Sequence, residues 1–355
     1  MLARSYPKVS SAVLRNSYFV IRPSSLVLYS DLALLLAERA LISRIRGQAQ
    51  RVRRQRGLVA GIGDDCAVLR IPTGREVLVT TDFSLEGIHF RRDWHPPDVV
   101  GHRCLARGLS DIAAMGGEPV AAFLSLALPG NLPQRWVDEF LAGLFKLGKQ
   151  FKVPLAGGDT AESPDGILAD VVVLGSVPKG KAILRSGARP GDRIYVSGAL
   201  GGAAATLEIL RSSSARQLPP ADFPAHFYPV PRVALGRILR KKRIPSAMID
   251  VSDGLSTDLA HICQESGVGA EIRAVAIPRA SLGQHKQEVD LPFSLHGGDD
   301  YELLFSAARD KKLPARIAGV RITEIGRVTQ GIGLFLIHNG KRKKFSVQGW
   351  EHFGR

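Results

Sequence analysis

The fold is decided by the stretch Ala247-Met248-Ile249-Asp250-Val251-Ser252-Asp253-Gly254-Leu255, which has the pattern of a buried strand that turns directly into a helix. Because side chains alternate along a strand, Asp250 and Ser252 are expected on one face. Asp253 follows at the turn, ahead of a helix that contains Asp258. Two carboxylates and a hydroxyl therefore converge at the end of one strand, and the strand-to-helix order predicts an α/β protein.

Acidic residues beside glycines recur along the chain. The loop Gly61-Ile62-Gly63-Asp64-Asp65-Cys66 carries two adjacent carboxylates, although taken alone it is best interpreted as a solvated turn. Glycines let a backbone approach a ligand closely, and neighbouring carboxylates can hold divalent cations. Comparable settings occur at the end of the strand expected over residues 76–82 and in two later glycine pairs: Thr80-Thr81-Asp82, Gly157-Gly158-Asp159 and Gly297-Gly298-Asp299.

Asp111 belongs to a different setting, near the end of a helix expected over residues 98–115. The helix macrodipole disfavours an anion there by about 0.3–1 kcal/mol unless a cation is nearby. Arg107, one turn earlier, could be that cation, and a metal ion is an equally good explanation.

The acidic residues together predict a magnesium site. If they share one cleft, each neighbouring pair at about 4 Å repels by about 4 kcal/mol at an effective dielectric near 20, so a fold must compensate them. Oxygen ligands without a His/Cys cluster favour Mg²⁺ over zinc, and substrate phosphates usually complete the coordination of Mg²⁺. This combination indicates nucleotide-dependent phosphoryl transfer.

Composition narrows the class of protein. The chain has 355 residues, of which 45% are hydrophobic and 23% charged, enough for two domains with separate cores. The formal net charge is +15, but residues 1–60 hold 11 Lys/Arg against 2 Asp/Glu, and no aromatic residues interleave the basic clusters. We therefore favour solvated basic surface over a nucleic-acid interface.

No apolar run is long enough to span a bilayer, so no membrane partner is expected. The three cysteines, Cys66, Cys104 and Cys263, lack metal-ligand spacing and are interpreted as small packing residues in a reducing, cytoplasmic protein.

The pattern predicts two domains joined by the Gly-, Pro- and Arg-rich stretch around residues 183–192. We place the N-terminal domain at residues 31–184 and the C-terminal domain at 185–355. A first helix is expected to begin at Asp31, and residues 211–229 are expected to form a loop. Residues 1–30, which contain no acid, are expected to be a disordered extension; a transit peptide has a similar composition and is the less favoured alternative.

The order of these motifs resembles the thiamine-monophosphate kinase family from about residue 31 to residue 353. The resemblance rests on segments 61–66, 81–90, 109–116, 157–160, 185–187, 249–255 and 297–305, read here as GIGDDC, TDFSLEGIHF, LSDIAAMG, GGDT, RSG, IDVSDGL and GGDDYELLF. It implies the two-domain α/β fold of the aminoimidazole-ribonucleotide synthetases. In that fold the N-terminal α/β domain binds ATP and Mg²⁺ and dimerises through its sheet.

The resemblance also implies the last step of thiamine diphosphate biosynthesis, in which ATP phosphorylates thiamine monophosphate by direct in-line transfer with several Mg²⁺ ions. Carried over by matching motifs, the metal ligands are Asp65, Asp82, Asp111, Asp159, Asp250 and Asp253, of which Asp159, Asp250 and Asp253 are assigned to catalysis. The ATP contacts are Thr80, Thr81, Arg185 and Ser252. The thiamine-phosphate side comprises His89, Asp299 and Trp350.

One departure from the family pattern bears on the substrate. Asp299 stands where Glu is expected, which shortens the reach of the carboxylate by one methylene. Two other functions remain open at this point. One is a related ATP-using synthetase of the same fold that acts on another small phosphate or carboxylate, and the other is a nucleic-acid-binding protein, suggested by the net charge alone.

Overall fold

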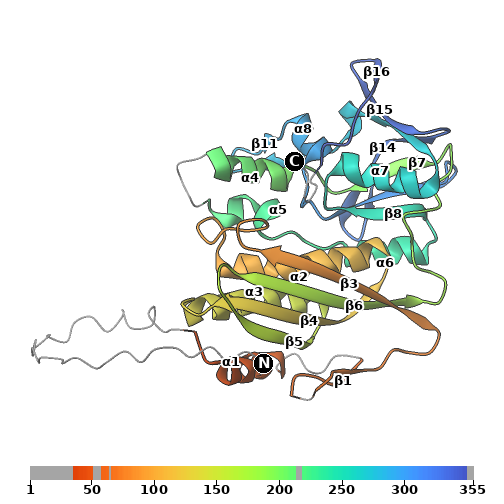
Figure 1. Ribbon diagram of the computed structural model, residues 1–355. Helices are drawn as coiled ribbons and strands as arrows, with labels where there is room; N and C mark the ends of the chain where they lie inside the picture. The colour runs from red at the N-terminus through yellow and green to blue at the C-terminus, as the bar shows by residue number, and fades with distance from the viewer. Residues whose placement is uncertain (1–34, 51–56, 64, 213–217, 350–355) are drawn as a thin grey trace, which may run out of the picture.

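The computed structural model describes residues 35–50, 57–63, 65–212 and 218–349 (Figure 1). The N-terminal half contains a four-stranded sheet in the order β3-β6-β4-β5, with helices α2 and α3 behind it. Its elements are α1 (Glu38–Gln50), β1 (Leu58–Ala60), β2 (Val68–Leu69), β3 (Arg75–Leu85), α2 (Pro97–Ala114), β4 (Glu118–Pro129), α3 (Gln134–Phe151), β5 (Leu155–Ser163) and β6 (Leu168–Pro178).

The C-terminal half is built on an eight-stranded sheet in the order β16-β15-β9-β14-β7-β12-β8, with β13 paired to β14. Its strands are β7 (Arg193–Ser197), β8 (Pro245–Val251), β9 (Gly269–Arg273), β12 (Glu302–Ala307), β13 (Arg316–Ile317), β14 (Val320–Thr329), β15 (Gly333–His338) and β16 (Lys341–Lys344). A separate hairpin joins β10 (Ser281–Leu282) to β11 (Gln287–Glu288). The helices are α4 (Gly202–Ser212), η1 (Pro220–Asp222), α5 (Pro224–Phe227), α6 (Val233–Lys241), α7 (Leu255–Ser266), η2 (Ala274–Ala276) and α8 (Leu291–His296).

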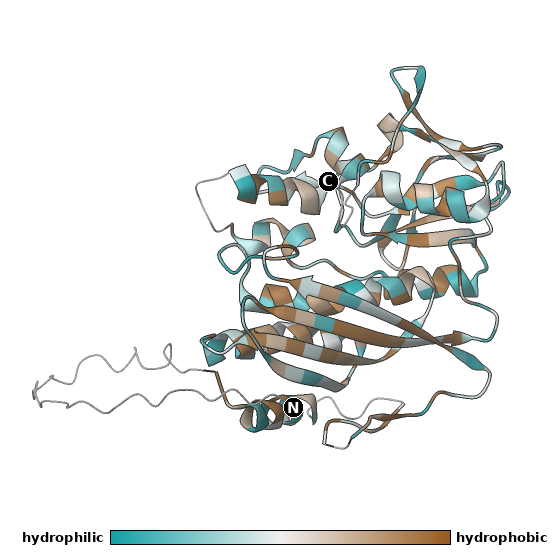
Figure 2. Cartoon of the chain, in the orientation of Figure 1, coloured by the Kyte–Doolittle hydropathy of each residue, from teal (hydrophilic) through white to brown (hydrophobic). Residues whose placement is uncertain are grey.

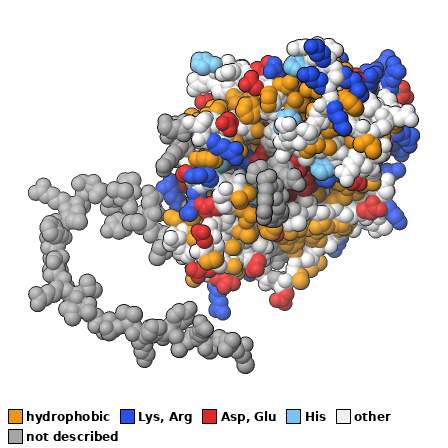
Figure 3. All heavy atoms as spheres, turned by 45° about the horizontal axis from the view of Figure 1, so that its top comes forward, with side chains coloured by type: hydrophobic (Ala, Val, Ile, Leu, Met, Phe, Trp, Pro, Cys, Tyr) orange, Lys and Arg blue, Asp and Glu red, His pale blue; other side chains and the backbone are white. Residues whose placement is uncertain are grey.

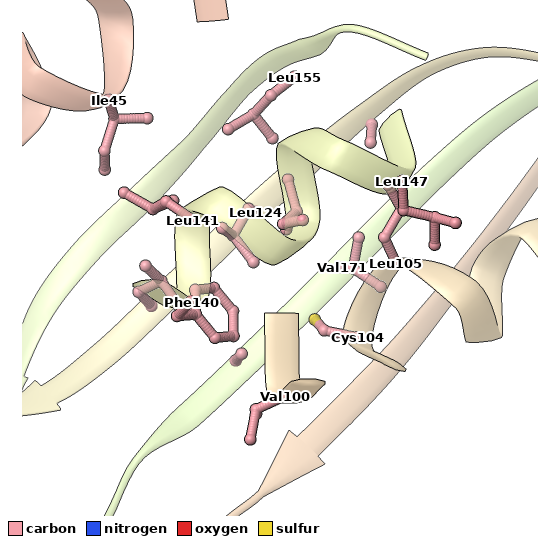
Figure 4. Close-up of a cluster of buried hydrophobic side chains, with 14 of the residues drawn as sticks. Ile45, Val100, Cys104, Leu105, Leu124, Phe140, Leu141, Leu147, Leu155 and Val171 are labelled. Atoms are coloured by element: carbon pink, nitrogen blue, oxygen red, sulfur yellow. The ribbon is translucent and has the colours of Figure 1, made fainter. Parts of the chain in front are cut away.

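Each half has its own hydrophobic core. In the N-terminal half, the core lies between the sheet and helices α2 and α3, where Leu105, Phe140 and Leu147 pack against strand residues such as Leu124 and Val171 (Figure 4). The strands of the N-terminal sheet are largely hydrophobic (Figure 2), because one face of the sheet is buried under helices. The second core lies between the C-terminal sheet and helix α7.

Helix α2 connects the two halves. It packs against α3, β3 and β6 on one side and against α6, β8 and β12 on the other. Its crossing with α3 is close, since a Cβ on Gly143 would lie 1.9 Å from the carbonyl oxygen of Asp98. A helix buried on both sides can carry polar residues only where other groups satisfy them. A buried polar residue on α2 therefore indicates a polar partner, and such a partner points to a possible functional site.

The predicted strand at residues 76–82 and the predicted helix at 98–115 are confirmed by β3 and α2. Two expectations were wrong. The first described helix begins at Glu38 rather than at Asp31, which lies outside the described residues, and residues 211–229 include the short helix α5 instead of forming only a loop. Pro224 favours that helix because proline suits the first helical position.

The cysteines divide into two kinds. Cys104 and Cys263 are buried, as expected, whereas Cys66 is exposed, so its interpretation as a packing residue was wrong. Cys66 lies in the loop between β1 and β2, a pair of strands too short to cover it. Among the described residues, no helix is both long and apolar enough to cross a membrane.

Candidate active site

Three carboxylates meet where helix α2 lies between the two halves. They come from separate elements, Asp82 from β3, Asp111 from α2 and Asp250 from β8, and we call them the acidic cluster. Thr80 Oγ1 donates a hydrogen bond to Asp111 Oδ2, and Ser110 Oγ donates to Asp250 Oδ2 at 2.6 Å. The second bond links α2 to the C-terminal sheet, so the acidic cluster lies at the junction of the halves.

Burial and mutual repulsion raise the pKa values of the acidic cluster. Burial raises the pKa of Asp82 to about 7, and the nearby Asp111 adds to the effect. The pKa of Asp250 also rises to about 7, through burial and then through Asp111. Burial likewise raises the pKa of Asp111, against the effect of its bond from Thr80 and the charge of Arg185. In the free chain at neutral pH, Asp82 and Asp250 are therefore partly protonated.

The acidic cluster fits a hard cation. Its donor atoms are carboxylate and hydroxyl oxygens, the ligands that Mg²⁺ prefers. Asp82 Oδ2 is buried and has no hydrogen-bond partner among the described residues, so it is available to a cation.

Arg107 is not the partner of Asp111 that the sequence allowed. Its guanidinium instead donates to the carbonyl oxygen of Phe83 at 2.7 Å and lies 3.6 Å from Asp299.

The turn after β8 holds Asp253 at the edge of the acidic cluster, where its charge raises the pKa of Asp111 further. Asp258 fixes this turn, because its Oδ2 accepts the backbone N–H groups of Asp253 at 3.2 Å and Gly254 at 3.0 Å. Gly254 has a φ of 113°, a conformation that side-chain-bearing residues rarely adopt. The Asp299 N–H donates to the Ser252 carbonyl at 2.8 Å, which places the two acidic turns side by side.

Asp299 is held by two arginines from α2. Arg103 donates to its Oδ2 at 2.8 Å, and Tyr301 donates to its Oδ1 at 2.6 Å. Burial opposes ionisation of this carboxyl, but Arg103 and then Arg107 keep its pKa below the usual range. Asp299 is therefore a carboxylate whose position is fixed by the N-terminal half. The shorter side chain suits this arrangement, because the arginines come to the carboxylate.

Two predicted site residues, the ATP contact Thr81 and the metal ligand Asp159, lie on the face of the N-terminal sheet that is turned away from α2 and α3. The register places Phe83, Asp170, Ser125 and Asp159 in one row, facing away from the core. Thr81 lies on the same face and donates to Asp170 Oδ1 at 2.7 Å. Within one chain, Asp159 on β5 is three strand spacings from Asp82 on β3, on the order of 14 Å. The structure thus does not bring Thr81 and Asp159 to the acidic cluster of the same chain.

The remaining predicted residues are scattered around these two groups. Asp65 and Arg185 are exposed, although the charge of Arg185 acts on Asp111. His89 is half-buried, and its Nδ1 accepts the backbone N–H of Leu85 at 3.0 Å. Trp350 lies outside the described residues, as does the predicted extension 1–30.

Sequence reasoning missed the residues that hold the acids in place. Ser110 and Arg103 lie on the buried faces of α2. The sequence around them does not indicate which distant residue each of them hydrogen-bonds to. Asp258 offered a better signal. An acid in the first turn of a helix, four residues after a glycine turn, is well placed to accept backbone N–H groups there.

Comparisons with known proteins assign this arrangement to a family. Residues 63–177 match the N-terminal domain, and residues 189–345 the C-terminal domain, of AIR synthase related proteins. Thiamine-monophosphate kinase of Escherichia coli K12 is 38% identical over 314 residues, which cover 85% of this chain and 95% of the relative. The chain belongs to the thiamine-monophosphate kinase family. The Bacillus subtilis enzyme of the family is 34% identical over 287 residues, covering 76% of this chain and 85% of the relative.

Solved structures of the family have the same fold. The crystal structure of thiamine-monophosphate kinase from Stenotrophomonas maltophilia K279a is 37% identical, with a TM-score of 0.73 over 86% of this chain and 98% of that chain. AaThiL complexed with AMPPCP and TMP is 32% identical, with a TM-score of 0.69 over 90% of this chain and 97% of that one. The predicted two-domain α/β architecture is thereby confirmed.

Removing a carboxylate from the acidic cluster should stabilise the free protein. Between pH 3.8 and about 7, folded Asp82 keeps a proton that the unfolded chain releases, so the free energy of unfolding falls as pH rises through that window. Asp82→Asn removes this loss and should raise the free energy of unfolding by about 1–3 kcal/mol at pH 8, with the gain shrinking towards pH 4. Denaturant unfolding without metal measures it.

The matched control is Asp310→Asn, which removes an exposed carboxylate and should leave the free energy of unfolding unchanged. An Asp82→Asn protein less stable than the original at pH 8 would mean that the carboxylate is compensated in the free chain, contrary to this view.

Proposed function

We propose that this chain transfers the γ-phosphate of ATP to the phosphate of thiamine monophosphate, giving thiamine diphosphate and ADP. The observation that carries the proposal is the acidic cluster at the junction of the halves, in a chain of the thiamine-monophosphate kinase family. Carboxylates that repel one another and have raised pKa values destabilise a fold. Such groups are therefore more typical of binding and catalytic sites. The resemblance predicts this reaction as the last step of thiamine diphosphate biosynthesis.

Magnesium is the cation that this donor set suits best. We propose that Asp82, Asp111, Asp250 and Asp253 hold Mg²⁺ together with the ATP phosphates. Magnesium neutralises the charge on the transferred phosphoryl group. The chain's own contribution is to hold these oxygens rigidly, through Thr80, Ser110 and Asp258.

Direct in-line transfer, without a phosphoenzyme, agrees with the nucleophiles that the described residues offer. Burial raises the pKa of the Cys104 thiol to about 12, which leaves it unreactive. His95 and His226 are committed to each other, with their Nε2 atoms 2.9 Å apart. Burial lowers the pKa of both imidazoles, so both are neutral, and neither is placed to receive a phosphoryl group.

The two substrates are proposed to meet at the acidic cluster, beside the adjacent turns of Ser252 and Asp299. Arg185 and Ser252 are proposed to contact ATP, Arg185 because its charge already acts on Asp111. Asp299, fixed by Arg103, is proposed to face the thiamine phosphate with His89 and Trp350.

The domain boundary at residues 184/185, just before Arg185, remains a prediction. It falls between the two ranges that match the family's N- and C-terminal domains.

We also propose that two copies pair through the N-terminal sheets. The face of the sheet opposite α2 and α3, turned toward the viewer in Figure 1, exposes apolar side chains on β3. Val79 is 66% exposed and Phe83 is 55% exposed. Figure 3 shows hydrophobic side chains gathered over the lower part of the molecule, where this sheet lies. Large exposed apolar patches mark interaction sites, and a partner sheet would cover this one.

Pairing would also give Asp159 and Thr81 a role. Both lie on the exposed face, away from the acidic cluster of their own chain. In a dimer formed through this face, they would lie at the interface between the N-terminal domains, the domains to which the family resemblance assigns ATP and Mg²⁺. We therefore propose that they act together with Asp65 at sites completed by the second copy.

The activity is tested by incubating the purified protein with Mg²⁺, ATP and thiamine monophosphate. Thiamine diphosphate and ADP should form in equal amounts, and Asp253→Asn should lower kcat at least 100-fold while circular dichroism and unfolding stay near those of the original. Asp310→Asn is the matched control. A panel of other small phosphates and carboxylates separates this enzyme from a related synthetase, and turnover of one of those without thiamine monophosphate would overturn the assignment.

The dimer is tested by Val79→Asp, which places a charge in the centre of the exposed apolar face. Sedimentation should show dimers for the original protein and monomers for this variant, because an unpaired charge cannot be buried at an interface cheaply. Val68→Asp is the control, since Val68 is 51% exposed on a different sheet. Dimers that persist in the Val79 variant would rule out this face.

A further inference from the structure

A cavity in the C-terminal half is not accounted for by the proposed reaction. It has a volume of about 760 Å³ and lies in the C-terminal half, where β7, β12 and β14 meet the segment before α6. None of the described residues assigned to Mg²⁺, ATP or thiamine monophosphate lines it. Its volume is in the range of small-molecule sites.

Two arginines face each other at this cavity. Arg316 on β13 and Arg321 on β14 are directly opposite in an antiparallel pair, and both line the cavity. Like charges in opposite positions of two strands repel each other. Arg316 donates only to the Gly319 carbonyl, at 3.0 Å, and neither arginine forms an ion pair within the described part of the chain. A ligand anion between the two guanidiniums would relieve the repulsion.

A hydroxyl group lies beside this pair. Thr323 is two residues beyond Arg321 on β14, so the two side chains share a face of the sheet. Thr323 lines the same cavity, and its Oγ1 is buried without a hydrogen-bond partner among the described residues. Buried hydroxyls are rarely left unsatisfied, and an orphaned one calls for a ligand or a water molecule.

Four of the other charged groups of the cavity wall form ion pairs. Arg232 donates through Nε to Glu302 at 2.8 Å, and Arg279 donates to Glu288 at 2.6 Å. The remaining acid, Asp300, accepts the backbone N–H of Gly201 at 2.6 Å, and burial raises its pKa well above the usual value, which favours its neutral form. The uncompensated groups are therefore the two guanidiniums and the Thr323 hydroxyl, all of which are hydrogen-bond donors.

We propose that this cavity is a second anion site, which binds the phosphate group of a small phosphorylated molecule between Arg316, Arg321 and Thr323. Guanidinium groups recognise phosphate through paired hydrogen bonds, and a hydroxyl can donate a third. Ile277 and Pro278 line the same cavity and give the organic part of the ligand an apolar surface. The site is independent of the proposed kinase reaction.

The probes are inorganic phosphate and pyrophosphate, titrated by calorimetry into the full-length protein without Mg²⁺ or nucleotide. The original protein should bind pyrophosphate at one site per chain, and Arg316→Gln and Arg321→Gln should each weaken binding at least tenfold. Arg237→Gln, which removes an exposed arginine from α6, is the matched control and should bind as the original does. Unchanged affinity in both cavity variants would overturn the proposal.

Asp253→Asn distinguishes this site from the proposed active site. Binding should survive in this variant, and loss of binding would assign the anion to the acidic cluster instead. Acetate is the second probe. Acetate binding as tight as that of phosphate would overturn the assignment to phosphate, because a carboxylate would then satisfy the site equally well.

Thr323→Val tests the hydroxyl separately from the fold. Because Oγ1 has no hydrogen-bond partner among the residues that the structure describes, the variant should keep the unfolding temperature of the original protein or exceed it, while phosphate binding weakens several-fold. A lower unfolding temperature with unchanged binding would show that the hydroxyl supports the fold rather than a ligand, and would remove Thr323 from the site.

Discussion

Three carboxylates on three elements, Asp250 buried and Asp82 and Asp111 half-buried, repel one another around helix α2, and the surrounding structure has to accommodate that repulsion. Asp82, Asp111 and Asp250 cannot all be ionised in a low-dielectric junction without a compensating charge. Raised pKa values show how the free chain accommodates them, since protons take the place of cations. Two of these groups are already held by hydrogen bonds, Asp111 from Thr80 and Asp250 from Ser110.

This constraint explains why the arginines of α2 face the other way. The charge of Arg107 acts on Asp82, yet Arg103 and Arg107 bind Asp299 and the Phe83 carbonyl rather than Asp111. An arginine bound to the acidic cluster would neutralise it permanently and compete with a cation. Its partnership with Asp299 instead keeps that carboxylate ionised and joins the C-terminal turn to the N-terminal half. Charge is thus separated into an acidic region suited to metal and phosphate and a fixed ion pair beside it.

Much of the fold could be predicted from the sequence, because the strands and helices that matter most have strong patterns. The periodic helix α2 was located to within two residues. The turn at Asp253 was predicted correctly, since Gly254 marks it. The faces of β3 were harder. Strand alternation already separates Thr81 from Thr80, but the family motif groups the two, and only the register of β3 with β6 shows that Thr81 bonds to Asp170 on the exposed face.

Partners distant in sequence could not be predicted at all. Nothing near Ser110 indicates that it bonds to Asp250, 140 residues later, and nothing near Arg103 indicates Asp299. The same holds for Arg316, Arg321 and Thr323, whose significance depends on a cavity that several segments enclose. Composition and spacing identify the residue types that a site needs. Only the packed chain shows which of them meet.

The central claim is that protons occupy the acidic cluster in the free chain and leave when metal and nucleotide bind. Calorimetry of a magnesium complex of a non-hydrolysable ATP analogue, at pH 7 in two buffers of different ionisation enthalpy, measures that exchange. The original protein should release protons on binding, and Asp82→Asn should release fewer, because the pKa of Asp82 is raised to about 7 in the free chain. Binding with the same proton release in both proteins would contradict the account.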